Sequence, residues 1–209
     1  MKLTMQQMIL DPGYHTLAED LKEFPLPDWL RLRRRRYAIP LTPEHFARTI
    51  CYGQRLFFTR EACDDFDAIV RLVGGYYYPL VMREKWHEDS VARIAKYILP
   101  CKVIDLYPVA MMFLGHMTTI IERETALLHR ELTKTERAAG VERLQPFNDL
   151  ISLDFLRDAM KVTTPEVLLT PYNECLVRFM MHKEVEDYRE RYADLLRIEQ
   201  EHKLKKQKK

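Results

Sequence analysis

The sequence predicts an all-α protein: an irregular domain of about eight helices around a buried central helix, with a long helix projecting at the C-terminal end. The first observation is the stretch 103–130, in which every residue from Leu106 to Leu114 except Pro108 is apolar or aromatic. The second is the small number of glycines, 6 in 209 residues, which is typical of helical proteins without many tight hairpins. The third is the lack of alternating strand patterns, since only residues 76–82 could form a strand.

The composition fits one soluble globular domain, or such a domain with an appendage. Hydrophobic residues make up 47% of the chain and charged residues 31%, which are ordinary values for a protein with a sizeable core. The net charge of +2 is too small for a polycation, so nucleic-acid binding would need a local basic patch. Without a C-x-x-C pair or an expected signal peptide, we predict reduced thiols and a cytoplasmic location. The four cysteines are Cys51, Cys63, Cys101 and Cys175.

The central stretch raises the question of a membrane span. Residues 103–121 reach the lower limit of about 17–20 residues for a spanning helix. Asp105 and His116 lie inside this stretch, and a charge at the membrane centre costs about 2.5–3.5 kcal/mol. We therefore expect this helix to lie in the core of a soluble protein, with the part after Thr118 turned partly to water.

The chain is expected to fall into three parts. Residues 1–40 form an N-terminal arm with two short helices and a basic run, residues 41–180 form the helical core domain, and residues 181–209 form a projecting charged helix with a lysine-rich tail. In the arm, Pro25 and Pro27 break the helical pattern before the basic run. An extended connector then leads to the core, because a residue before proline avoids the helical region.

Opening signals mark the helices of the core. Thr42, followed by a proline and an early glutamate, is a good N-cap for a helix that reaches Phe58. A helix over residues 64–73 is expected to end at the glycine pair 74–75. Later helices are signalled by Asp89 or Ser90 with a stop at Pro100, by a capping box that begins at Thr133 with a stop at Gly140, by residues 152–160, and by Thr-Pro openings at Thr164 and Thr170.

The last helix is the longest and carries two apolar stripes. From Tyr172 to Met180 a broad stripe is expected to face the core. Beyond it, apolar residues recur at spacings of 4, 3, 4 and 3, a heptad-like pattern that either receives a partner helix or lies on a charged, solvent-exposed helix. We predict that a protein partner binds this seam and the tyrosine cluster at residues 76–78. The residues are Met181, Val185, Tyr188, Tyr192 and Leu195, with Tyr76, Tyr77 and Tyr78.

No residue pattern predicts catalysis, a cofactor or a metal site. Two Glu-x-x-His pairs, beginning at Glu84 and Glu199, put a carboxylate and an imidazole on one helix face, but both lie in polar segments rather than in apolar helix interiors. His116 is interpreted as a core histidine with a hydrogen-bond partner. A cysteine–histidine pair that meets only in the fold is the remaining catalytic alternative. We expect the protein not to be an enzyme.

The strongest local charge feature is an arginine run near the N-terminus. Arginines occupy five of the six positions 31–36, and their guanidinium groups could hold phosphates while Trp29 and Tyr37 stack on bases. The same run could dock onto an acidic protein face or remain solvated. Nucleic-acid binding is therefore the alternative function, and its residues are Arg31, Arg33, Arg34, Arg35 and Arg36.

Residues 119–199 contain several short motifs in a characteristic order. They are Glu-Arg-Ala-Ala-Gly (136–140), Leu-Gln-Pro-Phe (144–147), Pro-Glu-Val-Leu (165–168), Pro-Tyr-Asn-Glu-Cys-Leu (171–176) and Tyr-Arg-Glu-Arg-Tyr (188–192). This part resembles small helical proteins of tailed bacteriophages, in particular the tail assembly chaperones encoded just before the tape measure protein.

The resemblance implies a non-enzymatic role in virion morphogenesis. Chaperones of that family cover the tape measure protein, a long hydrophobic helix, until tail tube subunits replace them. A longer form is often made by ribosomal frameshifting, and the lysine-rich end at residues 203–209 is compatible with slippage and equally with an ordinary basic tail. The predicted function is thus a phage or prophage tail assembly chaperone or related morphogenesis factor in the host cytoplasm. Its partner is a protein, with self-association as a further form of contact and no membrane binding.

Overall fold

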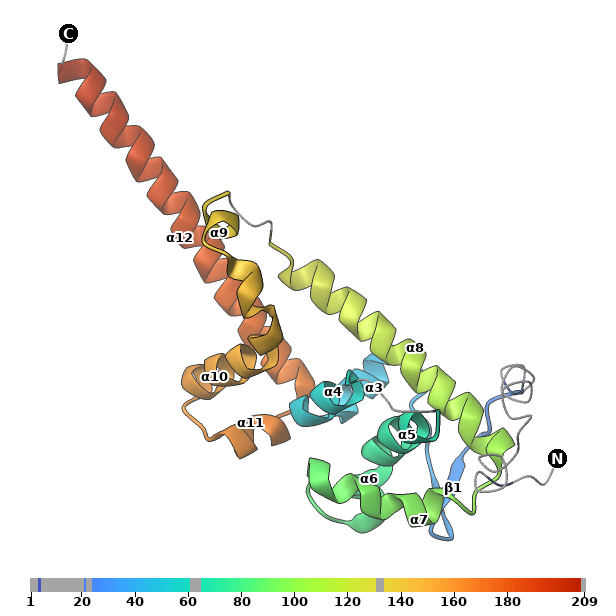
Figure 1. Ribbon diagram of the computed structural model, residues 1–209. Coiled ribbons are helices and arrows are strands. Elements are labelled where there is room, and N and C mark those ends of the chain that lie inside the picture. The colour runs from blue at the N-terminus through green and yellow to red at the C-terminus, as the bar shows by residue number, and fades with distance from the viewer. Residues whose placement is uncertain (1–3, 5–20, 22–23, 61–64, 131–133, 208–209) are drawn as a thin grey trace.

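A computed structural model describes residues 4, 21, 24–60, 65–130 and 134–207, and Figure 1 shows its course. The all-α class is confirmed, because helices form nearly all of its regular structure and the only sheet among the described residues is one small hairpin. In chain order the elements are β1 (Leu30–Leu32), β2 (Arg35–Tyr37), α3 (Pro43–Thr49), α4 (Tyr52–Phe58), α5 (Asp65–Ile69), η1 (Val70–Gly74), α6 (Gly75–Met82), η2 (Glu88–Ile94), α7 (Ala95–Ile98), α8 (Val103–Leu128), α9 (Lys134–Ala138), η3 (Val141–Phe147), α10 (Asn148–Met160), α11 (Thr164–Leu169) and α12 (Tyr172–Gln207).

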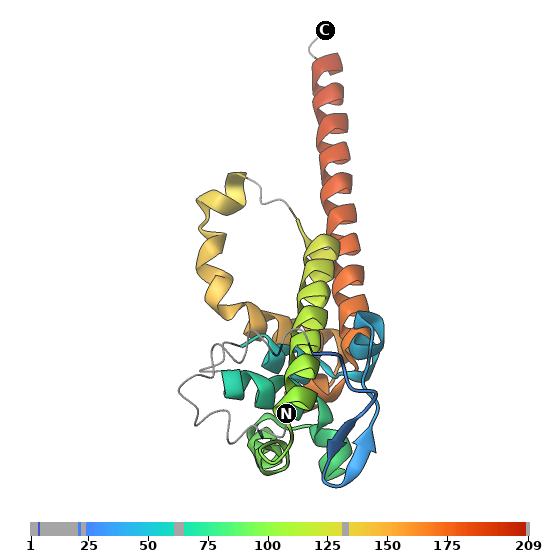
Figure 2. The ribbon, with the colours of Figure 1, turned by 90° about the vertical axis from the view of Figure 1, so that its right-hand side faces the viewer.

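The central helix is confirmed as the element around which the others pack. Helix α8 contacts α3, α5, η1 and the first part of α12, which lie around it in Figures 1 and 2. Its Phe113 belongs to an aromatic cluster, with ring centroids 4.9 Å from Phe46 and 4.9 Å from Tyr76. His116 is buried, and its Nε2 lies 2.9 Å from the backbone oxygen of Pro40, as expected for a core histidine with a partner.

By length and composition α8 could cross a membrane, and part of it packs inside the fold. Half of its most apolar window is buried inside the protein. The buried side chains include Leu106, Val109 and Phe113, whereas Leu114 and Ile121 are exposed. The burial of these side chains among neighbouring helices accounts for the apolar run as core packing.

The segment after residue 64 differs from the prediction. The glycine pair does not end a helix, because α5 continues through the π-helical η1 into α6. A Cβ atom at Gly74 would lie 2.7 Å from the side chain of Ile94, and one at Gly75 would lie 2.7 Å from Phe58. The glycines therefore serve close packing inside a continuous helical segment, and the strand considered for residues 76–82 is helix α6.

The single helix expected from Thr42 to Phe58 is two helices. The Thr42 hydroxyl accepts a hydrogen bond from the His45 backbone N–H at 3.2 Å, as predicted for an N-cap. The chain then leaves α3 at Ile50, where backbone bonds join it to the start of α12: Tyr172 N–H donates to Ile50 O (3.1 Å) and Tyr52 N–H donates to Thr170 O (2.9 Å). This pairing with a distant segment is what interrupts the helix.

The remaining predictions for the core hold in part. Thr163 caps α11 in a capping box with Glu166, one residue before the position expected from the sequence. Gly140 has a left-handed φ of 76°, as expected after a helix end. Leu30 and Leu32 are buried in the core, so this part of the expected N-terminal arm packs with the core domain. Most of the expected helices before Pro25, as well as Cys63 and Thr133, lie outside the described residues.

Candidate functional site

The apolar seam of α12 lies outside the globular core, as predicted. The seam comprises Met181, Val185, Tyr188, Tyr192 and Leu195, whose exposed fractions range from 46% to 65%. The helix has 36 residues and is therefore about 54 Å long, and its C-terminal part extends beyond every other element in Figures 1 and 2. Exposed apolar side chains at heptad spacing on a projecting helix are typical of a surface that receives another helix.

The first turns of α12 hold it to the core. Tyr172, Cys175 and Leu176 are buried, and the Phe179 ring centroid lies 5.5 Å from Phe155 and 6.1 Å from Tyr52. Further along, an ion pair with Arg130, just after α8, reaches Glu190 on this helix. Ion pairs three and four residues apart support the helix itself: Lys183–Asp187, Arg189–Glu186, Arg197–Asp194 and Lys203–Glu199.

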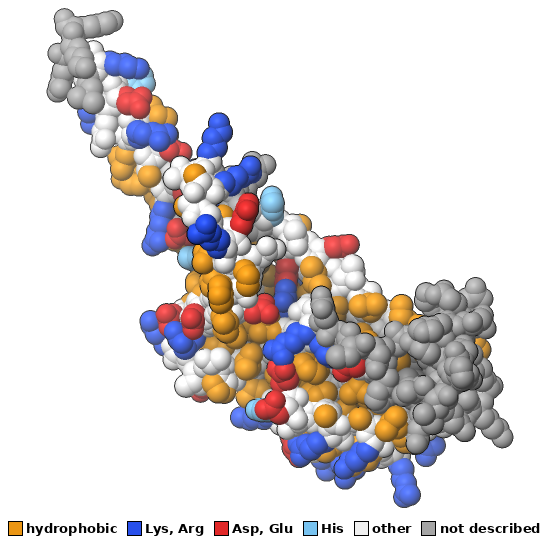
Figure 3. Space-filling view, in the orientation of Figure 1, with side chains coloured by type: hydrophobic (Ala, Val, Ile, Leu, Met, Phe, Trp, Pro, Cys, Tyr) orange, Lys and Arg blue, Asp and Glu red, His pale blue; other side chains and the backbone are white. Residues whose placement is uncertain are grey.

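Two stacked tyrosines lie in the middle of the seam, and further exposed apolar side chains lie around it. The rings of Tyr188 and Tyr192 stack with centroids 6.1 Å apart and an interplanar angle of 12°. Figure 3 shows apolar side chains on the projecting helix and again near its base, around η3 and α10. Exposed apolar residues there and along α12 include Leu144, Phe147, Leu150, Ile151, Leu196 and Ile198.

The tyrosine cluster is not available for partner binding, so that part of the site prediction was wrong. Tyr76 is 8% exposed, and Tyr77 and Tyr78 are fully buried. Their hydroxyl groups are hydrogen-bonded to Thr49 (3.0 Å), to the backbone oxygen of Ala38 (2.9 Å) and to Glu84 (2.7 Å), respectively. Burial raises the pKa values of Tyr76 and Tyr77. These tyrosines form the core that α6 contributes.

The arginine run forms a β-hairpin, which the sequence did not predict. Strands β1 and β2 pair antiparallel with Leu30 opposite Tyr37 and Leu32 opposite Arg35. The two turn residues, Arg33 and Arg34, both have positive φ angles, 48° and 63°. Such a turn matches the right-handed twist of the strands, but it strongly favours asparagine and glycine. Two arginines in this conformation are strained by about 1–2 kcal/mol each.

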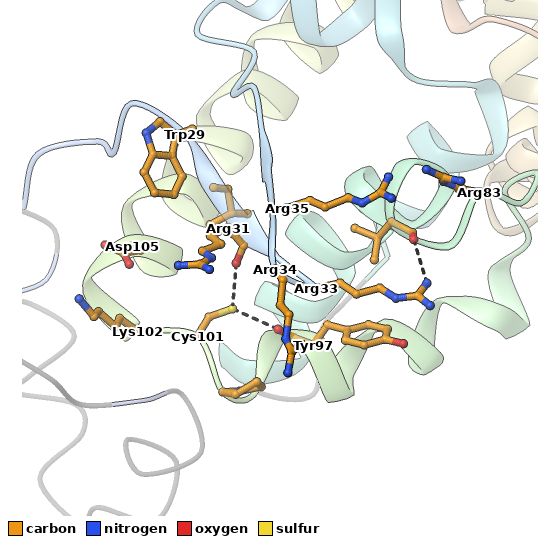
Figure 4. Close-up of a pocket in the computed structure, with 13 residues that line it drawn as sticks. Trp29, Arg31, Arg33, Arg34, Arg35, Arg83, Tyr97, Cys101, Lys102 and Asp105 are labelled. Carbon is orange, nitrogen blue, oxygen red and sulfur yellow. Dashed lines mark hydrogen bonds between the residues drawn. The ribbon is translucent and has the colours of Figure 1, made fainter.

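The hairpin forms one wall of a basic pocket with a volume of about 950 Å³. Figure 4 shows its side chains, with Lys102 and Arg31 at one side, Arg34 between, and Arg33, Arg35 and Arg83 at the other. Among the described residues, six positively charged side chains line it, and Asp105 is the one carboxylate that does so. The basic pocket therefore combines Arg31, Arg33, Arg34 and Arg35 from the hairpin with Arg83 after α6 and Lys102 before α8.

Several contacts hold the hairpin against the pocket floor. The Arg33 guanidinium donates to the backbone oxygen of Val81 (3.4 Å) and lies 5.5 Å from the Tyr97 ring centroid. The Cys101 thiol donates to the backbone oxygens of Tyr97 (3.1 Å) and Arg31 (3.5 Å). Burial, with a smaller contribution from Asp105, raises the pKa of Cys101 to about 11, so this thiol remains protonated at neutral pH and acts as a donor.

The glutamates of the two Glu-x-x-His pairs and the remaining described cysteines have contacts that serve structure. Glu84, from the first Glu-x-x-His pair, is hydrogen-bonded to Tyr78 and paired with Arg93. Glu199 pairs with Lys203 on its own helix. Burial raises the pKa values of Cys51 and Cys175, the latter to about 12, which keeps both thiols protonated. Among the described residues, no group of three or more metal-ligating side chains converges.

Sequence reasoning missed three side chains of the basic pocket. Arg83, Tyr97 and Lys102 come from segments distant in sequence from the hairpin, and only the fold brings them to it. Arg83 has a left-handed φ of 60° at the end of α6, where a glycine would be the usual signal. Nothing in the local sequence distinguishes Arg83 and Lys102 from other cations, or Tyr97 from other tyrosines.

Comparisons with protein-family models, curated proteins and solved structures gave no significant match. The functional argument therefore rests on the two surfaces described above, the apolar seam and the basic pocket. One is an apolar stripe on a projecting helix, and the other is a hollow lined by positive charge. Each is chemically distinct and can be altered without changing the other.

Proposed function

We propose that the protein is a non-enzymatic binding protein that holds an apolar helical segment of another protein along the seam of α12. In its specific form, the proposal is a phage or prophage tail assembly chaperone or related morphogenesis factor, whose partner is the tape measure protein. The observation that carries the general proposal is the exposed heptad-spaced seam on a helix that leaves the core. The specific form rests on the resemblance of residues 119–199 alone.

The chemistry of the seam suits reversible binding of a helix. Full burial of a large apolar side chain contributes about 1.5–3 kcal/mol, and association itself costs several kcal/mol. Five partly exposed side chains therefore support a contact of modest affinity, one that a later assembly partner can displace. Met181 adapts to different neighbours because methionine is unbranched and flexible. Several copies along one long apolar helix would together cover it.

The residues that flank the seam favour an ordered contact. With Met181, Val185, Tyr188, Tyr192 and Leu195 at the a and d positions of two heptads, the flanking e and g positions are partly charged and, near the end, apolar. They are His182, Glu184, Arg189, Arg191, Leu196 and Ile198. The charged flanks set the orientation of the partner, and the apolar flanks widen the contact toward the C-terminal end.

A labelled peptide of about four heptads, with leucine at every a and d position, tests the general proposal. Fluorescence anisotropy should show binding to the wild-type protein and at least a tenfold weaker affinity for Val185→Glu/Tyr192→Glu. The matched control is Ala193→Glu/Gln200→Glu, which adds the same charge at two exposed b positions, outside the seam and its e and g flanks, and should bind as the wild type does. Equal affinity of the seam variant and the wild type would contradict the proposal.

The specific form has a separate test in the native expression context. A minor product that shares residues 1 to about 200 and then continues in another reading frame is expected from the frameshifting that the resemblance implies. Mass spectrometry of bands that react with an antibody against the N-terminal residues would identify it. Detection of the 209-residue species alone would remove this support for a tail assembly chaperone, while the peptide experiment would still decide the general proposal.

A further inference from the structure

We propose that the basic pocket binds single-stranded nucleic acid, with its arginines on consecutive phosphates and its aromatic rings beside the bases. This function is independent of the apolar seam, because the pocket is built by β1, β2 and the segments around Arg83 and Lys102, and by no part of α12. The inference stands on four features of the pocket: its unpaired charge, the layout of that charge, its aromatic rings and its strained turn.

Most cations of the basic pocket have no ion-pair partner among the described residues. Within the part of the chain that the structure describes, no carboxylate forms an ion pair with Arg31, Arg34, Arg35, Arg83 or Lys102. Elsewhere in the same chain, arginines such as Arg55 and Arg93 do pair with glutamates. Six cations gathered in one hollow with a single carboxylate, Asp105, among the described lining residues indicate a site for an external anion.

The layout of the charges fits a chain of phosphates better than one phosphate. In Figure 4 the cationic groups extend along the pocket from Lys102 and Arg31, past Arg34, to Arg83, rather than converging on a point. Guanidinium groups bind phosphate oxygens in a bidentate manner, and they predominate over lysine here. A volume of about 950 Å³ is at the upper end of the range for small-molecule pockets, so it has room for more than one nucleotide.

Two aromatic rings and a carboxylate favour nucleic acid over an acidic peptide. Trp29 is 36% exposed at the pocket, with the Arg36 guanidinium 4.0 Å from its ring centroid, and Tyr97 lines the pocket floor. Tyr97 is half-buried, with Arg33 and Lys96 over its ring, so the exposed edge of Trp29 is the main surface for an unpaired base. Asp105 can accept a hydrogen bond from an amino group of a base, a donor that the side chains of an acidic peptide lack.

The strained turn places two of the cations at the pocket. Arg33 and Arg34 occupy left-handed positions that asparagine and glycine would fill without strain. Residues held in unfavourable backbone conformations cluster at binding and catalytic sites. The turn directs the Arg33 side chain across Tyr97, and Figure 4 shows Arg34 reaching past Cys101 toward the open side. The strained turn therefore lowers the stability of the protein but places two guanidinium groups at the pocket.

The test is fluorescence anisotropy with labelled oligothymidylate. A length of about 12 nucleotides lies within the site sizes typical of single-strand-binding proteins. If four phosphates are contacted, the affinity of the wild type should fall about 50-fold between 50 and 200 mM salt, since each contact contributes a slope of about 0.7. Arg34→Gln/Arg83→Gln should bind at least tenfold more weakly at 50 mM salt and lose only about sevenfold over the same salt range. The matched control, Arg137→Gln/Arg143→Gln, removes the same charge from exposed positions on α9 and η3 and should bind within twofold of the wild type.

Two further probes decide the class of ligand. Polyglutamate of equal charge and duplex DNA of equal length should each bind at least tenfold more weakly than the single strand. Bound oligonucleotide should quench the tryptophan fluorescence, and Trp29→Leu should abolish that quenching. Comparable binding of polyglutamate or of the duplex would overturn the proposal, as would a control double variant as weak as the pocket variant. The seam variant Val185→Glu/Tyr192→Glu should bind the oligonucleotide normally, which separates this test from that of the seam.

Discussion

The two long helices, α8 and α12, differ in what surrounds them. Helix α8 buries Leu106, Tyr107, Val109 and Ala110 in succession, so several of its faces meet other elements. Helix α12 is longer but buries side chains only in its first turns, and beyond Met180 it exposes one apolar stripe among charges. The two helices differ mainly in how their apolar residues are distributed. In α8 these residues lie on several faces, whereas in the projecting part of α12 they lie on one.

That difference indicates which helix maintains the fold and which is free to bind. A helix that is apolar on several sides is stable only inside a protein, and α8 accordingly holds the aromatic cluster together. A single stripe on a charged helix tolerates water but can be covered by one further helix. We therefore expect substitutions in α8 to change stability and substitutions in the seam to change binding.

The largest expected effect is on the aromatic cluster. Phe113→Ala should lower the free energy of unfolding by about 3–5 kcal/mol, because the ring is fully buried against Phe46, Tyr76 and Tyr77. Leu195→Ala in the seam should change it by less than about 0.5 kcal/mol. Denaturant unfolding followed by circular dichroism measures both. Similar losses for the two variants would show that the seam is packed against something in the free protein.

Loss of the ion pair on α8 should likewise lower the free energy of unfolding more than loss of the ion pair on α12. Arg55 on α4 pairs with Glu124 on α8, and the two side chains are only 18% and 14% exposed. Glu124→Gln should lower the free energy of unfolding by about 2 kcal/mol, since it leaves a largely buried guanidinium without its counter-charge. Glu190→Gln, which removes the more exposed partner of Arg130 on α12, should cost about 0–1 kcal/mol. Denaturant unfolding of both variants at one ionic strength is the check, and a reversed order would contradict the comparison.

Relief of the strained turn should stabilise the protein without affecting α12. Arg33→Asn/Arg34→Gly supplies the residues that a turn with two positive φ angles favours. We expect a gain of about 1 kcal/mol, seen as a rise of about 2–4 °C in the melting temperature. Peptide binding at the seam should not change, whereas oligonucleotide binding should weaken. A lower melting temperature would contradict the assignment of strain to these two residues.

The smallest expected effect is a change in pH dependence near the start of α12. Hydrogen bonds from the Thr163 backbone N–H and hydroxyl lower the pKa of Glu166. Because the folded pKa lies below the unfolded value, this carboxylate stabilises the fold at higher pH, and the contribution is lost as pH falls through the folded pKa. Glu166→Gln should therefore reduce the change of stability with pH in this acidic range. Thermal melts of both proteins between neutral pH and about pH 3 would show the difference, and superimposable pH profiles would contradict it.

The sequence predicted the two long helices because each carries a sustained pattern. The apolar run of α8 and the heptad spacing of α12 need no knowledge of distant neighbours. The break between α3 and α4 could not be foreseen in this way, because it depends on backbone bonds from Ile50 and Tyr52 to the segment before α12. The glycine pair in η1 and α6 was wrongly predicted to end a helix for a similar reason. These glycines allow close packing against Ile94 and Phe58, which are distant in the sequence.

Of the candidate sites, the seam was predictable and the basic pocket was only partly so. Seam residues lie on one helix, so their spacing alone places them together. The hairpin escaped prediction because Arg33 and Arg34 replace the asparagine and glycine that usually signal such a turn. Tyr77 and Tyr78 were predicted to bind a partner but fill the core through α6. Aromatic composition by itself does not tell a binding surface from a buried one.

Hydrogen exchange along α12 tests the central claim most directly. The account predicts slow exchange for residues 172–180, which are held by the core, and much faster exchange from Met181 onward at any protein concentration. Addition of the leucine-heptad peptide should then protect residues 181–198. Uniform protection of the whole helix in the free protein, or no added protection with the peptide, would contradict the conclusion that the seam is an open surface for a partner helix.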